Sequence, residues 1–135
     1  MRIMAIDYGD QRIGLAVSDL LGTITGEAWT LHEWDAERAA QTIVRECADR
    51  EVGQLVLGLP RNMDGTEGPR AEKSREFAAL LSRLGAPPVV LWDERRTSVD
   101  AHRILHESGL KMKKHRRKVD AVAASLILEG YLNSL

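Results

Sequence analysis

Three acidic residues, far apart in the sequence, stand where elements of secondary structure are expected to end or begin. Asp7 closes an apolar stretch, Glu94 follows the apolar stretch 89–92, and Asp120 opens the last apolar helix. Carboxylates that share one place repel one another, and a divalent cation removes that repulsion. Mg²⁺ prefers oxygen ligands, and a pair of such ions can stabilise the attacking and leaving oxygens of phosphoryl transfer. The three acids therefore favour Mg²⁺- or Mn²⁺-dependent attack of an activated water on a phosphodiester.

Each acid also has a purely structural explanation. An Asp after a strand is commonly a turn residue, and a carboxylate in the first turn of a helix is favoured by the helix dipole. Glu94 could simply pair with Arg95 or Arg96. Spacing alone does not show that the three acids converge. It also leaves open whether Asp93 or Glu94 faces the site, because neighbouring strand residues point to opposite sides; we choose Glu94.

A basic segment separates Glu94 from Asp120. Residues 95–118 hold nine Lys or Arg against two acids, about +7, although the net charge is −1, so the remainder is about −8. Lys and Arg supply the sequence-independent phosphate contacts of nucleic-acid binding, whereas a solvated charge run is the alternative. The expected nucleic-acid-binding residues are Arg95, Arg96, Lys111, Lys113, Lys114, Arg116, Arg117 and Lys118.

A sheet must bring these residues together. Apolar stretches at 2–7, 12–18 and 23–31, separated by short turns, predict three antiparallel strands. The expected order continues with a helix at 36–47 capped by Asp35, a buried strand at 54–59, a loop at 60–70, a helix ending at Gly85, a strand at 89–93, a helix at about 97–107, a basic loop at 111–118 and a last helix from 119. This order predicts an α/β fold in one domain, 1–135, with a mixed five-stranded sheet and helices on both faces.

Composition narrows the class of protein. The single cysteine, Cys47, excludes an intrachain disulfide and a Cys-only zinc site, and it is expected in the core. No apolar run approaches the roughly 20 residues of a membrane helix, and no signal peptide is evident. We therefore expect a cytoplasmic protein.

Several other residues have competing interpretations. Gly9 either permits a tight turn or admits a phosphate backbone, and Asn62 and Asp64 are either turn residues or substrate contacts. The spacing of His102 and His106 can bind zinc, but no third ligand is evident, and surface positions are favoured. Aromatic content of 4% argues against a platform for stacking single-stranded bases, so the three tryptophans are assigned to packing: Trp29, Trp34 and Trp92.

Four ordered blocks resemble one known family. IDYGDQRIGLAVSD, VLGLPRNMDGTEGPRA, WDERRTSVDAHRIL and KVDAVAASLILEGYL are similar to the YqgF family, described as pre-16S ribosomal RNA nucleases or Holliday-junction-resolvase-like proteins. The resemblance covers about residues 1–132 and implies a ribonuclease H-like fold. It implies catalytic and metal-binding roles for Asp7, Glu94 and Asp120. Asp10 departs from the small or hydroxyl residue usual in the family, and we expect it to hydrogen-bond the loop.

The resemblance implies a hydrolase that matures the 5′ end of pre-16S rRNA, with nucleic acid and ribosomal particles as partners, as a monomer or weak homodimer. A Holliday-junction DNA nuclease and a non-catalytic nucleic-acid-binding module are the alternatives. A fragment of an actin-like phosphotransferase is a third, because the turn after Asp7 also occurs in that class. The sequence does not decide between pre-rRNA and branched DNA.

Overall fold

The computed structural model describes residues 1–93 and 112–135, with side chains in the second range from position 121 onward. Three strands come first, and helices and strands alternate after them among the described residues. Their bounds are β1 (Arg2–Asp7), β2 (Arg12–Ser18), β3 (Thr25–His32), α1 (Ala36–Asp49), β4 (Val52–Leu59), α2 (Pro69–Arg83), β5 (Val89–Asp93) and α4 (Met112–Ser134). The helix expected at 97–107, including His102 and His106, lies outside the described residues.

The five strands form one mixed sheet in the order β3-β2-β1-β4-β5. β2 pairs antiparallel with β1 and with β3, while β4 is parallel to both β1 and β5. The expected meander of three antiparallel strands followed by parallel crossovers is therefore confirmed. Parallel neighbours place the carboxyl ends of β1, β4 and β5 at the same end of the sheet.

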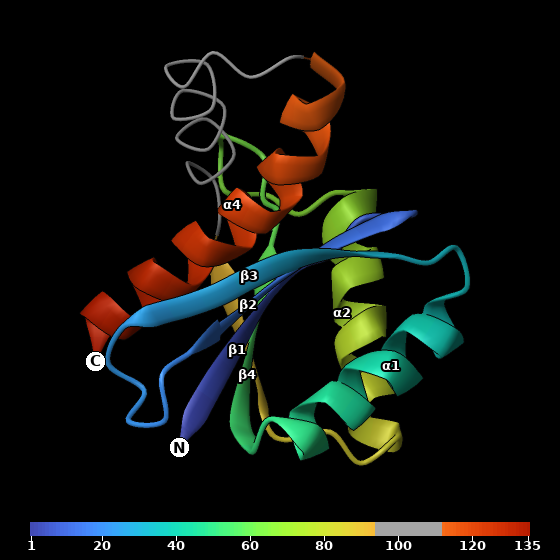
Figure 1. The fold of residues 1–135 in the computed structure, drawn as a ribbon. Helices are drawn as coiled ribbons and strands as arrows, with labels where there is room; N and C mark the ends of the chain where they lie inside the picture. Colours follow the sequence, from blue (N-terminus) through green and yellow to red (C-terminus); the bar gives the residue numbers. More distant parts are fainter. Residues whose placement is uncertain (94–111) are drawn as a thin grey trace.

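Helices cover both faces of this sheet (Figure 1). On one face, α1 and α2 pack through buried side chains such as Ile43 and Phe77 against the even-numbered residues Met4 and Ile6 of β1. On the other face, α4 packs through residues such as Ile127 against the odd-numbered Ala5. Because strand side chains alternate, β1 contributes to two cores at once.

Local signals set the helix ends. The Asp35 carboxylate caps α1 by accepting hydrogen bonds from the backbone N–H groups of Glu37 and Arg38, as its sequence position predicts. α2 begins at Pro69, whose missing N–H is no loss in a first turn, and so it reaches two residues into the predicted loop. Gly85 follows α2 with φ +87°, the left-handed conformation that glycine accepts most readily.

The start of α4 corrects one expectation. The basic run 111–118 was assigned to a loop, but from Met112 it is helical, so α4 begins seven residues before the predicted start at Val119. Lys, Arg and Met are good helix formers, and this run contains neither Gly nor Pro. Charge clustering made the run resemble a loop, whereas backbone propensity carries the helix through it.

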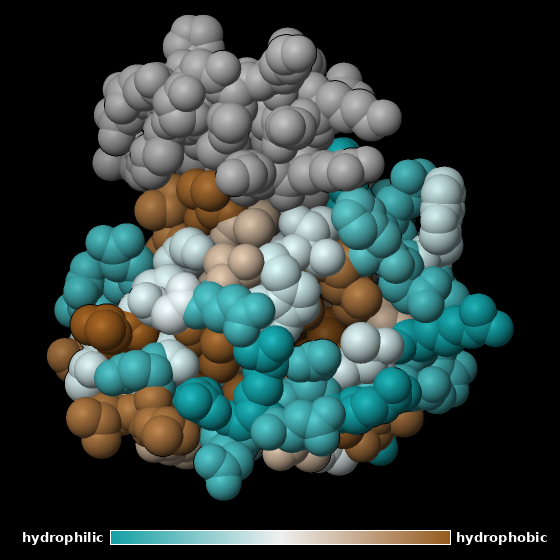
Figure 2. All heavy atoms as spheres, viewed as in Figure 1, coloured by the Kyte–Doolittle hydropathy of each residue, from teal (hydrophilic) through white to brown (hydrophobic). Residues whose placement is uncertain are grey.

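The end of the sheet opposite to the carboxyl ends carries exposed apolar side chains. The turn between β2 and β3 presents Leu20, Leu21 and Ile24 to solvent, and Figure 2 shows apolar surface at that end. The Asp19 carboxylate holds the turn by accepting hydrogen bonds from the backbone N–H and hydroxyl of Thr23 at 2.7 and 2.8 Å. In the described part of the chain, no helix is long and apolar enough to cross a membrane.

Candidate active site and an adjoining groove

The last residues of three parallel strands meet at one edge of the sheet, which we call the carboxyl edge: Asp7, Leu59 and Asp93. The β1–β4 ladder extends to the pair Ile6–Leu57, and the β4–β5 ladder extends to the pair Leu59–Asp93. In open α/β sheets, ligands bind in the crevice beyond this edge. The structure thus places Asp7 where the sequence predicted a functional residue.

Side-chain alternation assigns Asp7 to one face of the sheet. Ile3 and Ala5 pack in the core under α4, so Asp7, two residues further on, belongs to the same face, whereas Tyr8 belongs to the opposite one. The Asp7 side chain is half-buried. On β5, Trp92 packs under α4, and the exposed Asp93 therefore belongs to the other face.

The other two expected acids are placed only in part. Glu94 lies outside the described residues, and for Asp120 only the backbone is described. That backbone corrects the prediction that Asp120 lies in a first helical turn, because α4 starts eight residues earlier, at Met112. The helix dipole acts mainly within the first turn, so it no longer gives Asp120 a structural explanation.

The expected nucleic-acid-binding residues are also described only in part. Arg95, Arg96 and Lys111 lie outside the described residues. The backbone of the first turns of α4 carries the others, Lys113, Lys114, Arg116, Arg117 and Lys118. In Figure 1 these turns, drawn in orange, stand at the end of the sheet where β1 and β4 finish. The basic run is thus a helical segment near the carboxyl edge.

No group of three metal-ligating side chains occurs among the described residues. Of the three expected ligands, Asp7 has a described side chain, whereas Glu94 and Asp120 do not.

The turn after Asp7 is tightly anchored. The Tyr8 ring stacks on the Phe77 ring of α2, with centroids 4.1 Å apart and planes inclined by 16°. Burial, followed by the charge of Asp10, raises the pKa of the Tyr8 phenol. A Cβ at Gly9 would lie only 2.6 Å from the carbonyl oxygen of Arg12, so the fold of the turn itself requires glycine. This favours the tight-turn explanation of Gly9.

Asp10 has a partner on a neighbouring element. Its carboxylate accepts a hydrogen bond from the Lys73 ammonium of α2 at 3.2 Å, and this is an ion pair between exposed side chains. The sequence predicted that Asp10 would hydrogen-bond its own loop, but the structure pairs it with α2 instead. The pair joins the β1–β2 turn to the helix that carries Phe77.

The loop after β4 is a compact hairpin held by its own side chains. Asp64 accepts hydrogen bonds from the Thr66 backbone N–H at 2.9 Å and from its hydroxyl at 2.6 Å, and Asn62 donates to the same hydroxyl at 3.0 Å. The Thr66 hydroxyl is the main cause that lowers the pKa of Asp64. Asn62 and Asp64 thus act as turn residues, which is one of the two roles that the sequence left open.

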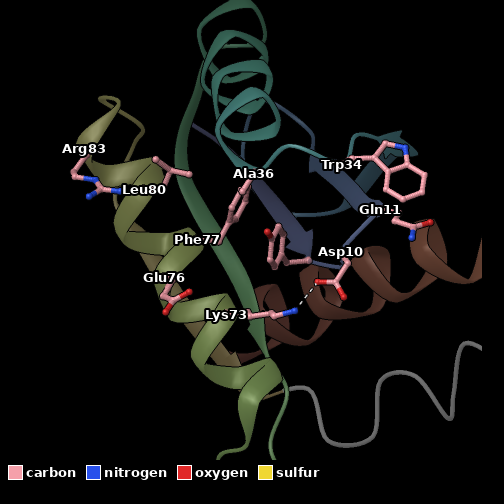
Figure 3. A pocket seen from close by; sticks show the side chains of 10 residues that line it. Asp10, Gln11, Trp34, Ala36, Lys73, Glu76, Phe77, Leu80 and Arg83 are labelled. Atoms are coloured by element: carbon pink, nitrogen blue, oxygen red, sulfur yellow. Dashed lines mark hydrogen bonds and ion pairs between the residues drawn. The ribbon is translucent and has the colours of Figure 1, made fainter.

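An open groove of about 650 Å³ lies on the α2 side of the β1–β2 turn (Figure 3). One wall is a helical stripe of α2, and the other is formed by the turn and the start of α1. The lining residues are Tyr8, Asp10, Gln11, Trp34, Ala36, Lys73, Glu76, Phe77, Leu80 and Arg83. Tyr8, the residue directly after Asp7, is thus part of the groove lining.

Trp34 corrects another expectation. Trp29 and Trp92 pack against the two cores as predicted, but Trp34 is 77% exposed at the groove. Its position between Glu33 and Asp35, just before a helix cap and outside any apolar periodicity, is the sequence signal that could have indicated exposure. Cys47 is buried in the core as predicted.

Over residues 1–134, the sequence matches the model of a family described as "RuvX: Holliday junction resolvase". The chain belongs to the RuvX family. A relative from Halothermothrix orenii is 45% identical over 98% of this chain and 95% of its own length, and one from Ruminiclostridium cellulolyticum is 42% identical over 100% and 96%. Both are named "Putative pre-16S rRNA nuclease". The family resemblance seen in the sequence is confirmed.

Solved structures share the fold of this RuvX-family chain. Thermus thermophilus RuvC in complex with a Holliday junction substrate superposes with a TM-score of 0.62 at 12% identity, covering 99% of this chain and 97% of that one. The Fowlpox virus Holliday junction resolvase superposes with a TM-score of 0.62 at 15% identity over 100% of both chains. At these identities the likeness concerns the fold, and it confirms the predicted ribonuclease H-like architecture.

Proposed function

We propose that this RuvX-family protein is a hydrolase, a metal-dependent endonuclease that cleaves phosphodiester bonds in structured nucleic acid. We propose further that it acts as a single domain, 1–135, and processes the 5′ end of pre-16S rRNA. The observation that carries the proposal is the position of Asp7, half-buried at the carboxyl edge on the face covered by α4, in a chain whose family is described as resolvases. The names of the relatives support the RNA substrate.

The chemistry of the donor set fits Mg²⁺ or Mn²⁺, because Asp7 offers oxygen ligands at a strand end and the two proposed partners are also carboxylates. Glu94 follows Trp92 by two residues, and Trp92 faces α4 as Asp7 does. Asp120 precedes Ala124 by one helical turn, and Ala124 is buried between α4 and the sheet. These positions support a shared site for Asp7, Glu94 and Asp120.

When bound, such an ion would stabilise the negative charge that develops on the attacking and leaving oxygens of the phosphodiester. The contribution of the chain is orientation. The turn that follows Asp7 is fixed on α2 by the Tyr8–Phe77 stack and by the ion pair of Asp10 with Lys73. A carboxylate held at the end of such a strand loses little conformational freedom on binding a ligand.

The basic residues would grip the phosphate backbone. Lys113, Lys114, Arg116, Arg117 and Lys118 lie within the first two turns of α4, and Arg95, Arg96 and Lys111 precede that helix in sequence. Contacts of this kind fix the position of a nucleic acid without selecting its sequence. The proposal therefore includes recognition of substrate shape and a strong dependence of affinity on salt.

The decisive experiment compares Asp7→Asn with the wild type on a precursor rRNA and a four-way DNA junction, with Mn²⁺ and with EDTA. We expect Asp7→Asn to remain folded and to lose at least about 100-fold in cleavage, because loss of a ligand should cost no less than loss of a residue that orients one. Asp49→Asn is the matched control, since Asp49 is exposed at the last residue of α1, next to the start of β4 and thus at the opposite end of the sheet. A folded Asp7→Asn protein that cleaves as the wild type does would refute the assignment.

A Holliday-junction nuclease is the second candidate, and the description of the family favours it. The two substrates of the experiment separate it from the rRNA nuclease. Binding without any product under Mg²⁺ or Mn²⁺ would instead support a non-catalytic module.

A further inference from the structure

The Trp34 groove has features that the proposed cleavage chemistry does not use. Among the described residues, Trp34 is the one aromatic residue that is mainly exposed, with 77% of its surface in contact with solvent. This ring lines an open groove of about 650 Å³, so its face is accessible to a ligand that enters the groove. The indole gives the groove a flat face on which another planar group can stack.

The groove is aromatic and nearly balanced in charge. Tyr8 and Phe77 line its inner wall as a stacked pair, and Figure 3 shows Trp34 and Arg83 at opposite ends. Lys73 is neutralised by Asp10 within the groove, while Glu76 and Arg83 add one charge of each sign. Such a surface attracts a planar, partly apolar ligand more strongly than it attracts a bare phosphate.

The groove is also continuous with the carboxyl edge. A smaller cavity of about 90 Å³, which shares Tyr8, Asp10 and Lys73 with the groove, continues to Gly9 and Arg70. Tyr8 directly follows Asp7 and faces the other side of the sheet. An extended ligand bound beside Asp7 that crosses the β1–β2 turn would therefore enter the groove. The ligand that would follow such a path is a strand of the nucleic acid itself.

We propose that the Trp34 groove binds a short single-stranded segment that flanks the cleaved structure. One base stacks on the Trp34 indole, and neighbouring phosphates pass two exposed cations, Arg83 at the far end of the groove and Arg70 in the smaller cavity. Stacking on aromatic side chains tolerates any base, because every base has a π face. This inference rests on the proposed nuclease function, since it is the position of Asp7 that makes a nucleic-acid strand the expected occupant.

Fluorescence anisotropy with a labelled single-stranded RNA of about eight nucleotides tests the groove without any cleavage. We expect Trp34→Ala to weaken binding about tenfold and Trp34→Phe to restore most of the loss, because Phe keeps a stacking face. Leu21→Ala is the matched control, since Leu21 is 80% exposed at the opposite end of the sheet, and it should bind as the wild type does. At 77% exposure, the Trp34 side chain contributes little to folding, so its loss should leave the protein folded.

A second measurement connects the groove to the substrate. The wild type should bind a duplex with a single-stranded overhang more tightly than the same duplex with blunt ends, and Trp34→Ala should lose that advantage. Equal affinity of Trp34→Ala and wild type for the oligonucleotide would overturn the inference, and it would indicate that Trp34 serves a protein contact instead. If the wild type binds the overhang through Trp34 but cleaves nothing with Mn²⁺, the nuclease assignment fails and the groove assignment stands.

Discussion

Replacing the stacked rings of Tyr8 and Phe77 by leucine tests how the carboxyl edge is anchored. The rings lie 4.1 Å apart, nearly parallel, and Tyr8 is the residue directly after Asp7. An aromatic pair of this kind contributes about 0.5–1.5 kcal/mol beyond the burial of its area. Each single leucine variant should lose the interaction energy between the two rings. The double variant loses the same interaction energy, so the sum of the two single losses counts it twice.

The magnitudes follow from burial. Phe77 is almost fully buried, so Phe77→Leu should lower the free energy of unfolding by about 1–2 kcal/mol, a volume-similar exchange plus the lost pair. Tyr8→Leu, at a half-buried position, should lower it by about 1 kcal/mol. The double variant should then be about 1 kcal/mol more stable than the sum of the single losses predicts.

Urea unfolding of the four proteins measures this cycle, and Tyr8→Phe is the control because it keeps both rings. Losses that add to within about 0.3–0.5 kcal/mol would refute the coupling. Cleavage provides a second measurement. Since Tyr8 is joined to Asp7, a looser turn displaces the carboxylate, and a misplacement of about 1 Å can lower a rate by up to about 100-fold. Phe77→Leu should therefore lower activity under conditions in which the protein is still fully folded.

Three further outcomes are expected. Ser18→Ala should lower the free energy of unfolding by about 1–3 kcal/mol in urea titrations, because the buried Ser18 hydroxyl accepts the Ile3 backbone N–H at 2.9 Å and its loss leaves that donor without this acceptor. The hydrogen bond from the backbone N–H of Thr23 lowers the pKa of the Asp19 carboxyl group in the folded protein. The ionised Asp19 therefore contributes its full stabilisation above the unfolded pKa near 3.8, and this stabilisation is lost as the pH falls through the lower folded pKa. The stability difference between wild type and Asp19→Ala should accordingly be constant above about pH 5 and shrink on acidification below about pH 4, and a difference that persists unchanged to pH 2 would contradict this. Burial raises the pKa of Cys47 to about 11 and also shields the thiol, which is 2% exposed. An aromatic disulfide reagent followed by absorbance at pH 8 should therefore react with the native thiol at least about 100-fold more slowly than with the unfolded chain.

Much of the sheet could be predicted because its strands carry two local signals. The stretches 2–7, 12–18 and 89–93 coincide with β1, β2 and β5, since each is an apolar run that begins or ends at turn residues. The predicted end of the first strand then placed Asp7 at the carboxyl edge, as the structure has it. The side chains of Glu94 and Asp120 lie outside the described part, so their convergence with Asp7 stays a prediction.

The remaining differences have physical causes. The basic run before Asp120 was assigned to a loop from its charge, but Lys and Arg are good helix formers and the run contains no Gly or Pro that would break a helix. Trp34 was assigned to packing from its residue type, but a residue between a strand and a helix cap has no face of either element to bury it. The groove joins residues from three separated segments, and no periodicity within any one of them predicts it.

Alternate residues of β1 pack into the two hydrophobic cores on opposite faces of the sheet. The number of residues in β1 therefore matters for the fold as much as their types do. Adding or deleting a single residue between Ile3 and Asp7 would exchange the sides of every position after it, sending the carboxylate toward α2 and the Tyr8 ring toward α4. Substitutions that preserve size can be absorbed locally, but a frame change of one position cannot. An insertion is therefore better accommodated in the turn after β1 than within the strand.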